Sequence, residues 1–115
     1  MTAQIHNAEH RQFISHKIVV VARGIISGEL GLIAGSRQLW RLGSEIGADR
    51  DPDFTFFCAV DSESDHLPIG EVRQRWSSDA LREKDSEIAK IESFYRERAL
   101  EICRRLVQRY ESDAA

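Results

Sequence analysis

Residues 77–112 read SSDALREKDSEIAKIESFYRERALEICRRLVQRYES. Apolar residues recur three, four or seven positions apart in this stretch, a spacing that places them on one face of a helix: Leu81, Ile88, Ile91, Tyr95, Ala99, Ile102, Leu106 and Tyr110. Ser77-Ser78-Asp79 in front of them supplies a helix cap and an acidic first turn. The pattern predicts a C-terminal helix of about eight turns.

Charged residues cover the rest of this predicted helix. Glu92 and Glu101 each precede an arginine by four residues, an order that favours ion pairs along a helix. Three arginines gather near the C-terminal end, where the helix dipole favours positive charge: Arg104, Arg105 and Arg109. We interpret them as a solvated helix face rather than a nucleic-acid patch.

Two earlier segments also have helical spacing. Residues 8–27 carry one apolar face and predict a first helix; residues 30–46 predict a second, which Gly47 ends. Glycines recur at positions 24, 28, 31 and 35, and they allow two interpretations. Gly28 either ends the first helix as a left-handed cap, or the small residues let two helices approach closely. We favour the break, because a glycine inside a helix costs roughly 1 kcal/mol relative to alanine.

Residues 54–60, FTFFCAV, suit either a short buried helix or a strand. Asp51 before Pro52 matches an N-cap followed by proline at the first helical position, and no partner strand is evident, so we predict a helix. The fold class predicted is all-α: one domain over residues 1–115, with about three main helices and one or two short ones. The long C-terminal helix packs along the hairpin of the first two, and residues 1–7 and 111–115 fray.

Composition narrows the function classes. The chain has 16 Lys and Arg against 19 Asp and Glu, a net charge of -3, so no overall basic field favours nucleic acid. The apolar region 18–42 is interrupted by Arg23, Glu29 and Arg37, which argues against a membrane span. Cys58 and Cys103 lack a CxxC partner and suit reduced core thiols. We expect a cytoplasmic protein that binds neither nucleic acid nor membrane.

Residues 61–76, DSESDHLPIGEVRQRW, bring chemically capable side chains together. Four of them are of the residue types that form a hard-metal site or a general acid/base pair: Asp61, Glu63, Asp65 and His66. A calcium loop starting at Asp61 fails, because it needs glycine where His66 stands and an acid where Val72 stands. No catalytic nucleophile motif accompanies the histidine. We therefore predict no bound metal and no cofactor.

The interpretation favoured for this segment is an acidic loop whose carboxylates cap helix ends and pair with Arg73 and Arg75, holding Trp76 against the core. Trp40 is likewise expected to anchor the core. A partner-contact surface and a catalytic site over residues 61–66 remain as alternatives. The candidate binding residues are Asp61, Glu63, Asp65, His66, Arg73 and Trp76.

Several runs of the sequence match a pattern shared by a protein family: GELGLIAGSR at 28–37, DSESDHLPIG at 61–70, and Arg73, Trp76 and Lys84-Asp85. The chain resembles an uncharacterised group of small bacterial proteins that share a domain of unknown function, with a DSE[ST]DHLPxGxxRxxW motif. The resemblance implies a free-standing bacterial cytoplasmic domain, and it implies no activity. It supports residues 61–76 as the segment to test.

These observations predict an interaction module rather than an enzyme, with another protein or a second copy as its partner. An immunity- or antitoxin-like role fits by analogy of size and charge alone. The alternative is a metal-assisted hydrolase that uses the acidic segment 61–66.

Overall fold

The structure, a computed structural model, describes residues 2–114, and the side chains of residues 7–113. Its elements are α1 (Thr2–Ser27), α2 (Leu32–Glu45), α3 (Pro52–Ser64), the 3-10 helix η1 (Gly70–Arg75) and α4 (Ser78–Ala114). No strand occurs in this part of the chain, so the predicted all-α class is confirmed, as is a helix rather than a strand over 54–60. α1 begins earlier than predicted, and α4 is longer, with 37 residues. Fraying at 1–7 and 111–115 stays a prediction.

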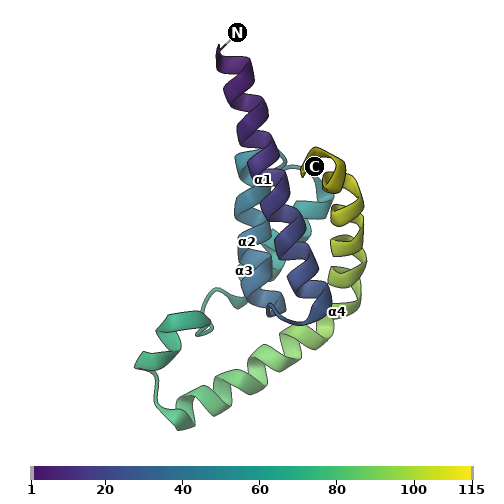
Figure 1. The fold of residues 1–115 in the computed structure, drawn as a ribbon. Coiled ribbons are helices and arrows are strands. Elements are labelled where there is room, and N and C mark those ends of the chain that lie inside the picture. Colours follow the sequence, from purple (N-terminus) through teal and green to yellow (C-terminus); the bar gives the residue numbers. More distant parts are fainter. Residues whose placement is uncertain (1, 115) are drawn as a thin grey trace.

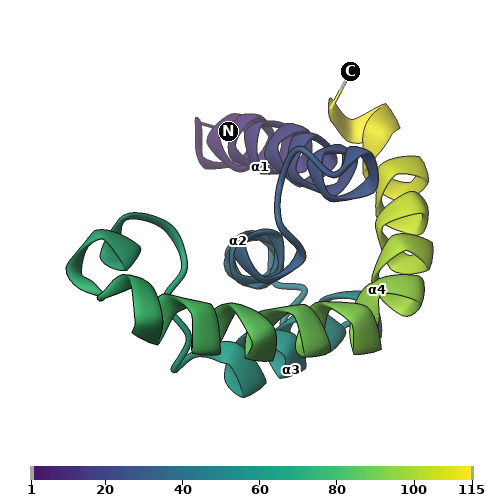
Figure 2. The ribbon, with the colours of Figure 1, turned by 90° about the horizontal axis from the view of Figure 1, so that it is seen from below.

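The helices form a bundle with one projecting side (Figure 1). α1 packs against α2 and most extensively against α4, while α2 packs against α3. α4 bends: its green first half crosses the lower end of the bundle near α3, and its yellow half runs beside α1 (Figures 1 and 2). The predicted packing of the long helix along the first hairpin therefore holds mainly at α1. No helix within residues 2–114 combines the length and apolarity that a bilayer crossing needs.

The glycines of the first hairpin act both as a helix cap and as a site of close helix packing, the two interpretations that the sequence allowed. Gly28 has φ of 85°, and the Leu30 N–H donates to the Gly24 carbonyl at 3.0 Å, so the predicted left-handed cap is confirmed. Gly35 serves the other purpose, because a Cβ there would overlap the side chain of Ile25. The first hairpin thus needs a break at one glycine and a close helix approach at another.

The start of α2 is completed from a distant helix. Gly31 at its N-cap offers no side-chain oxygen, and the Leu32 N–H instead donates to Oε2 of Glu92 on α4, at 3.0 Å. A carboxylate at a helix N-terminus satisfies a free N–H and interacts favourably with the helix dipole. Glu92 thus joins α4 to α2, a contact outside the pairing expected within its own helix.

The start of α3 combines a local cap with long-range ion pairs. Asp51 accepts from the Asp53 N–H at 3.0 Å with Pro52 at the first turn, as predicted. Arg105 of α4 donates from Nε and Nη2 to the Asp53 carboxylate, at 3.0 Å to Oδ2 and 2.6 Å to Oδ1, and Arg109 pairs with Asp51. Burial raises the pKa of Asp51, but the Asp53 N–H and Arg109 outweigh it and leave this pKa below its usual value. These two arginines therefore dock α4 on α3 rather than only facing solvent.

The core lies where α1, α2, α3 and the second half of α4 meet. Its largest side chains with almost no exposure include Phe54, Phe57, Leu39, Leu106 and Tyr110. Phe54 and Tyr110 meet edge to face with centroids 5.9 Å apart. α1 and α4 supply most of the remaining core, including Ile14, Ile18, Ala22, Ala99 and Ile102.

Candidate functional site

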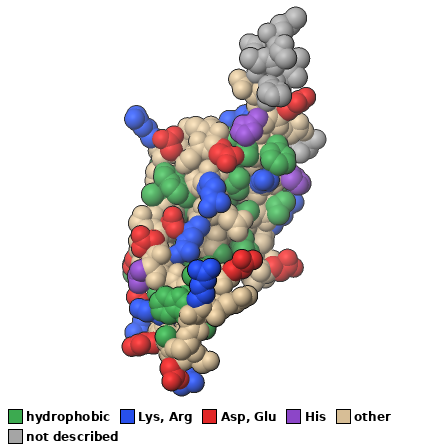
Figure 3. All heavy atoms as spheres, turned by 90° about the vertical axis from the view of Figure 1, so that its left-hand side faces the viewer, with side chains coloured by type: hydrophobic (Ala, Val, Ile, Leu, Met, Phe, Trp, Pro, Cys, Tyr) green, Lys and Arg blue, Asp and Glu red, His purple; other side chains and the backbone are tan. Residues whose placement is uncertain are grey.

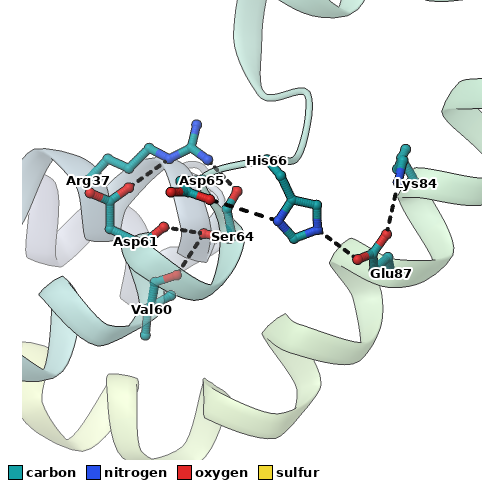
Figure 4. Close-up of polar contacts among 8 residues, drawn as sticks. All are labelled: Arg37, Val60, Asp61, Ser64, Asp65, His66, Lys84 and Glu87. Atoms are coloured by element: carbon teal, nitrogen blue, oxygen red, sulfur yellow. Dashed lines mark hydrogen bonds and ion pairs between the residues drawn. The ribbon is translucent and has the colours of Figure 1, made fainter.

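The first four residues of the acidic segment, 61–64, are helical where a loop was predicted. α3 continues through Ser64, so Asp61 and Glu63 lie on its last turn and project in different directions. Ser64 Oγ donates to the Val60 carbonyl at 2.7 Å, and Arg37 Nη2 donates to the Ser64 carbonyl at 2.6 Å (Figure 4). The Arg37 contact adds a bond to a carbonyl at the C-terminal end of α3, where the Leu67 N–H also donates to Ser64 at 3.0 Å.

The arginine that meets Asp61 comes from α2. Arg37 Nε donates to Asp61 Oδ1 at 3.0 Å, with side chains 27% and 33% exposed respectively, so this pair is partly shielded from water (Figure 4). The predicted partners Arg73 and Arg75 are not involved in this pair. The local sequence did not indicate the Arg37–Asp61 pair, because these two residues lie 24 positions apart.

Glu63 and His66 connect α3 to α4. The Tyr95 hydroxyl donates to Glu63 Oε2, and this bond to a carboxylate raises the pKa of the tyrosine. His66 Nε2 lies 2.8 Å from Glu87 Oε1, which holds the pKa of Glu87 below its usual value, and Lys84 Nζ reaches the other oxygen of Glu87 at 3.4 Å (Figure 4). Glu63 and His66 therefore stabilise the packing of the C-terminal end of α3 against α4.

The segment from His66 to Glu87, which we call the arm, projects from the bundle with η1 at its centre (Figure 1). Arg73 closes the arm on itself: it donates to both carboxylate oxygens of Asp85, at 2.7 and 3.0 Å, and to the Pro68 carbonyl at 3.2 Å. Trp76 is partly buried but lies outside the core cluster, so its predicted role as a core anchor is wrong, whereas Trp40 packs against the core as expected. Trp76 begins the link to α4, where few helices surround it.

The candidate catalytic residues do not converge on one point. Asp61 faces Arg37, Glu63 faces Tyr95, and Asp65 is 75% exposed with only a 3.9 Å approach to His66 Nδ1. No group of three or more His, Cys, Asp and Glu side chains suited to a metal ion occurs in the described part of the chain. The arrangement offers structural pairing, and nothing in it points to a hydrolase.

A groove between α1 and α2 is the feature that sequence reasoning missed. It has a volume of about 710 Å³, with Phe13 and Val20 of α1 on its rim, 57% and 54% exposed. The buried side chains of Ile14, Val21 and Leu42 also line it. Figure 3 shows hydrophobic groups between histidine and basic side chains on this side of the molecule, below the grey end. We call this feature the α1–α2 groove.

A signal for the groove was present in the sequence. Phe13, Lys17 and Val20 follow a four-and-three spacing on one stripe of α1 that differs from its core face. The prediction of this helix rested on the stripe that faces the core, because that stripe is longer. A second short apolar stripe on the same helix indicates either more burial or a contact surface.

Comparison with known protein families identifies the family of this chain. Residues 2–106 match the family described as "Protein of unknown function (DUF2489)". The chain belongs to the DUF2489 family. A search of the curated proteins and one of the solved structures found no significant match. The DUF2489 match spans α1 to the greater part of α4, and so includes both the α1–α2 groove and the arm. The expected domain of unknown function is thereby confirmed.

Proposed function

We propose that this chain is a protein-interaction module and that it binds another protein through the α1–α2 groove. The main observation in support of this proposal is the exposure of Phe13 and Val20 at the rim of the 710 Å³ groove. Large apolar side chains gathered in a hollow with a polar border are typical of binding surfaces. An immunity- or antitoxin-like role is one narrower form of this function, in which the bound protein is a toxin.

The acidic segment supports a binding role less well. Its side chains Asp61, Glu63 and His66 each bind a partner within the chain, as does Arg73 in the arm. A partner that used them would have to replace these contacts, whereas Phe13 and Val20 expose apolar surface without losing any such bond. Contact through the acidic segment therefore stands as the competing outcome of the test.

The test compares three surfaces of one molecule in cells of its source organism. A photo-crosslinking amino acid is placed at position 13 in the groove, 65 in the acidic segment or 94 on α4, all of which are exposed. We expect one specific protein adduct from position 13 and none from position 94. An adduct from position 65 alone would move the function to the acidic segment. The absence of adducts at all three positions would contradict the interaction module.

A further inference from the structure

The spacing of the exposed apolar residues along the groove matches that of a bound helix. Phe13 and Val20 are seven residues apart on α1, which corresponds to about 10 Å along the helix axis. A helix laid in such a groove presents apolar side chains at i, i+3 or i+4, and i+7, and these cover the same length. Ile14 and Val21 of α1 and Leu42 of α2 supply buried apolar surface beside these two side chains.

The charge of the groove differs from that of the whole chain. Lys17 of α1 and Arg41 of α2 line it, and Glu45 is the single carboxylate among its lining residues. Among the side chains that the structure describes, neither Lys17 nor Arg41 makes an ion pair. Lys17 lies over the Phe13 ring, with Nζ 4.5 Å from its centroid. A chain of net charge -3 thus carries a locally basic apolar groove.

Resting on the proposed function, we infer that the occupant of the groove is an amphipathic α-helix of another protein, with carboxylates beside its apolar stripe. The apolar stripe covers Phe13 and Val20, and the carboxylates meet Lys17 and Arg41. Opposite charges at the edge of an apolar contact raise the association rate and exclude partners of the wrong charge.

A second copy of this chain fits the groove poorly. In a symmetric dimer the same groove of each copy would meet, so Lys17 and Arg41 of one copy would approach those of the other, where like charges repel. The exposed Phe94 on α4 offers the groove no uniform charge, because Lys90, Glu97 and Arg98 surround it and Arg98 pairs with Glu101. The charge pattern therefore favours a different protein with an acidic helix.

The experiment uses the 115-residue chain and three labelled helical peptides of one apolar pattern, flanked by glutamate, glutamine or lysine. Fluorescence anisotropy measures binding at low and high salt. We expect the glutamate peptide to bind at least about tenfold more tightly than the glutamine peptide, and the lysine peptide to bind most weakly. Affinity for the glutamate peptide should fall as salt rises.

Protein variants assign the effect to the groove. The double variant Lys17→Glu and Arg41→Glu should reverse the preference toward the lysine peptide. Phe13→Ser should weaken all three peptides, and Phe94→Ser, the matched control at another exposed phenylalanine, should change none. Circular dichroism checks that each variant stays folded.

The outcomes separate this inference from the proposed function. Equal binding of the three peptides, still lost in Phe13→Ser, would overturn the acidic partner and leave the groove as an interaction site. No peptide binding together with a crosslinked partner at position 13 would overturn the helical occupant alone. Sedimentation that shows a dimer abolished by Phe13→Ser would overturn the separate partner in favour of a second copy.

Discussion

Replacing Gly43 by alanine should destabilise the protein by up to about 2 kcal/mol, although alanine is the better helix former. A Cβ at Gly43 would lie 2.6 Å from Phe54 Cγ and would also overlap Cδ1 of that ring. Phe54 is fully buried and packs on Tyr110, so its ring has little room to move. Overpacking a core costs about 1–3 kcal/mol, and the helix propensity returns about 1 kcal/mol.

A double-mutant cycle with Phe54→Leu isolates this contact. The smaller leucine leaves room for the added methyl group, so Gly43→Ala should be neutral or stabilising by up to about 1 kcal/mol in that background. Urea unfolding followed by far-UV circular dichroism measures each free energy, with an unchanged m-value as the check on two-state behaviour. The reasoning is refuted if Gly43→Ala stabilises the parent protein as much as it stabilises the Phe54→Leu variant.

Three further results are expected. Asp85→Asn should speed proteolysis within the arm and leave the urea midpoint of the whole protein unchanged, because the bidentate contact with Arg73 joins exposed side chains within one segment; a large loss of global stability would show that the arm supports the core. The pKa of Asp51 is lowered on folding, so its stabilisation is present above the ordinary value of 3.8 and is lost as the pH falls below it. Urea midpoints should therefore drop in acid, less steeply in Asp51→Asn, and identical pH profiles would count against this. Burial raises the pKa of Cys103 to about 12, so a thiol reagent should modify partly exposed Cys58 first and reach Cys103 only on unfolding; rapid reaction at both would refute it.

The projecting arm shows how far local patterns reach. Ser77 caps α4 as predicted, with its Oγ accepting from the Ala80 N–H at 3.2 Å. The same patterns placed Trp76 in the core, because an indole beside aliphatic residues is usually buried. Burial depends on whether other helices arrive at that position, and the bundle leaves the arm largely outside.

The sequence placed the candidate site over residues 61–76, a location that stays a prediction, and it did not predict the contacts made there. Asp61, Glu63 and His66 do lie near the junction of α3 and α4, but each binds a residue between 21 and 32 positions away. A carboxylate pairs with whichever cation or hydroxyl folding brings near, and sequence distance carries little of that information. The second stripe on α1 is visible in the sequence, but only the packing of the helices makes α2 the other wall of the groove.

The sequence by itself determined the helices and most of their ends. Apolar spacing, the left-handed glycines Gly28 and Gly47, and the Asp51 cap act over a few residues, so they can be recognised without the fold. Only the tertiary structure decided that Glu92 completes the start of α2, 60 residues away, and that Arg105 holds Asp53, 52 residues away. The physical reason is that the partners of a charged group are set by the packing of the helices that carry them, which depends on the whole chain.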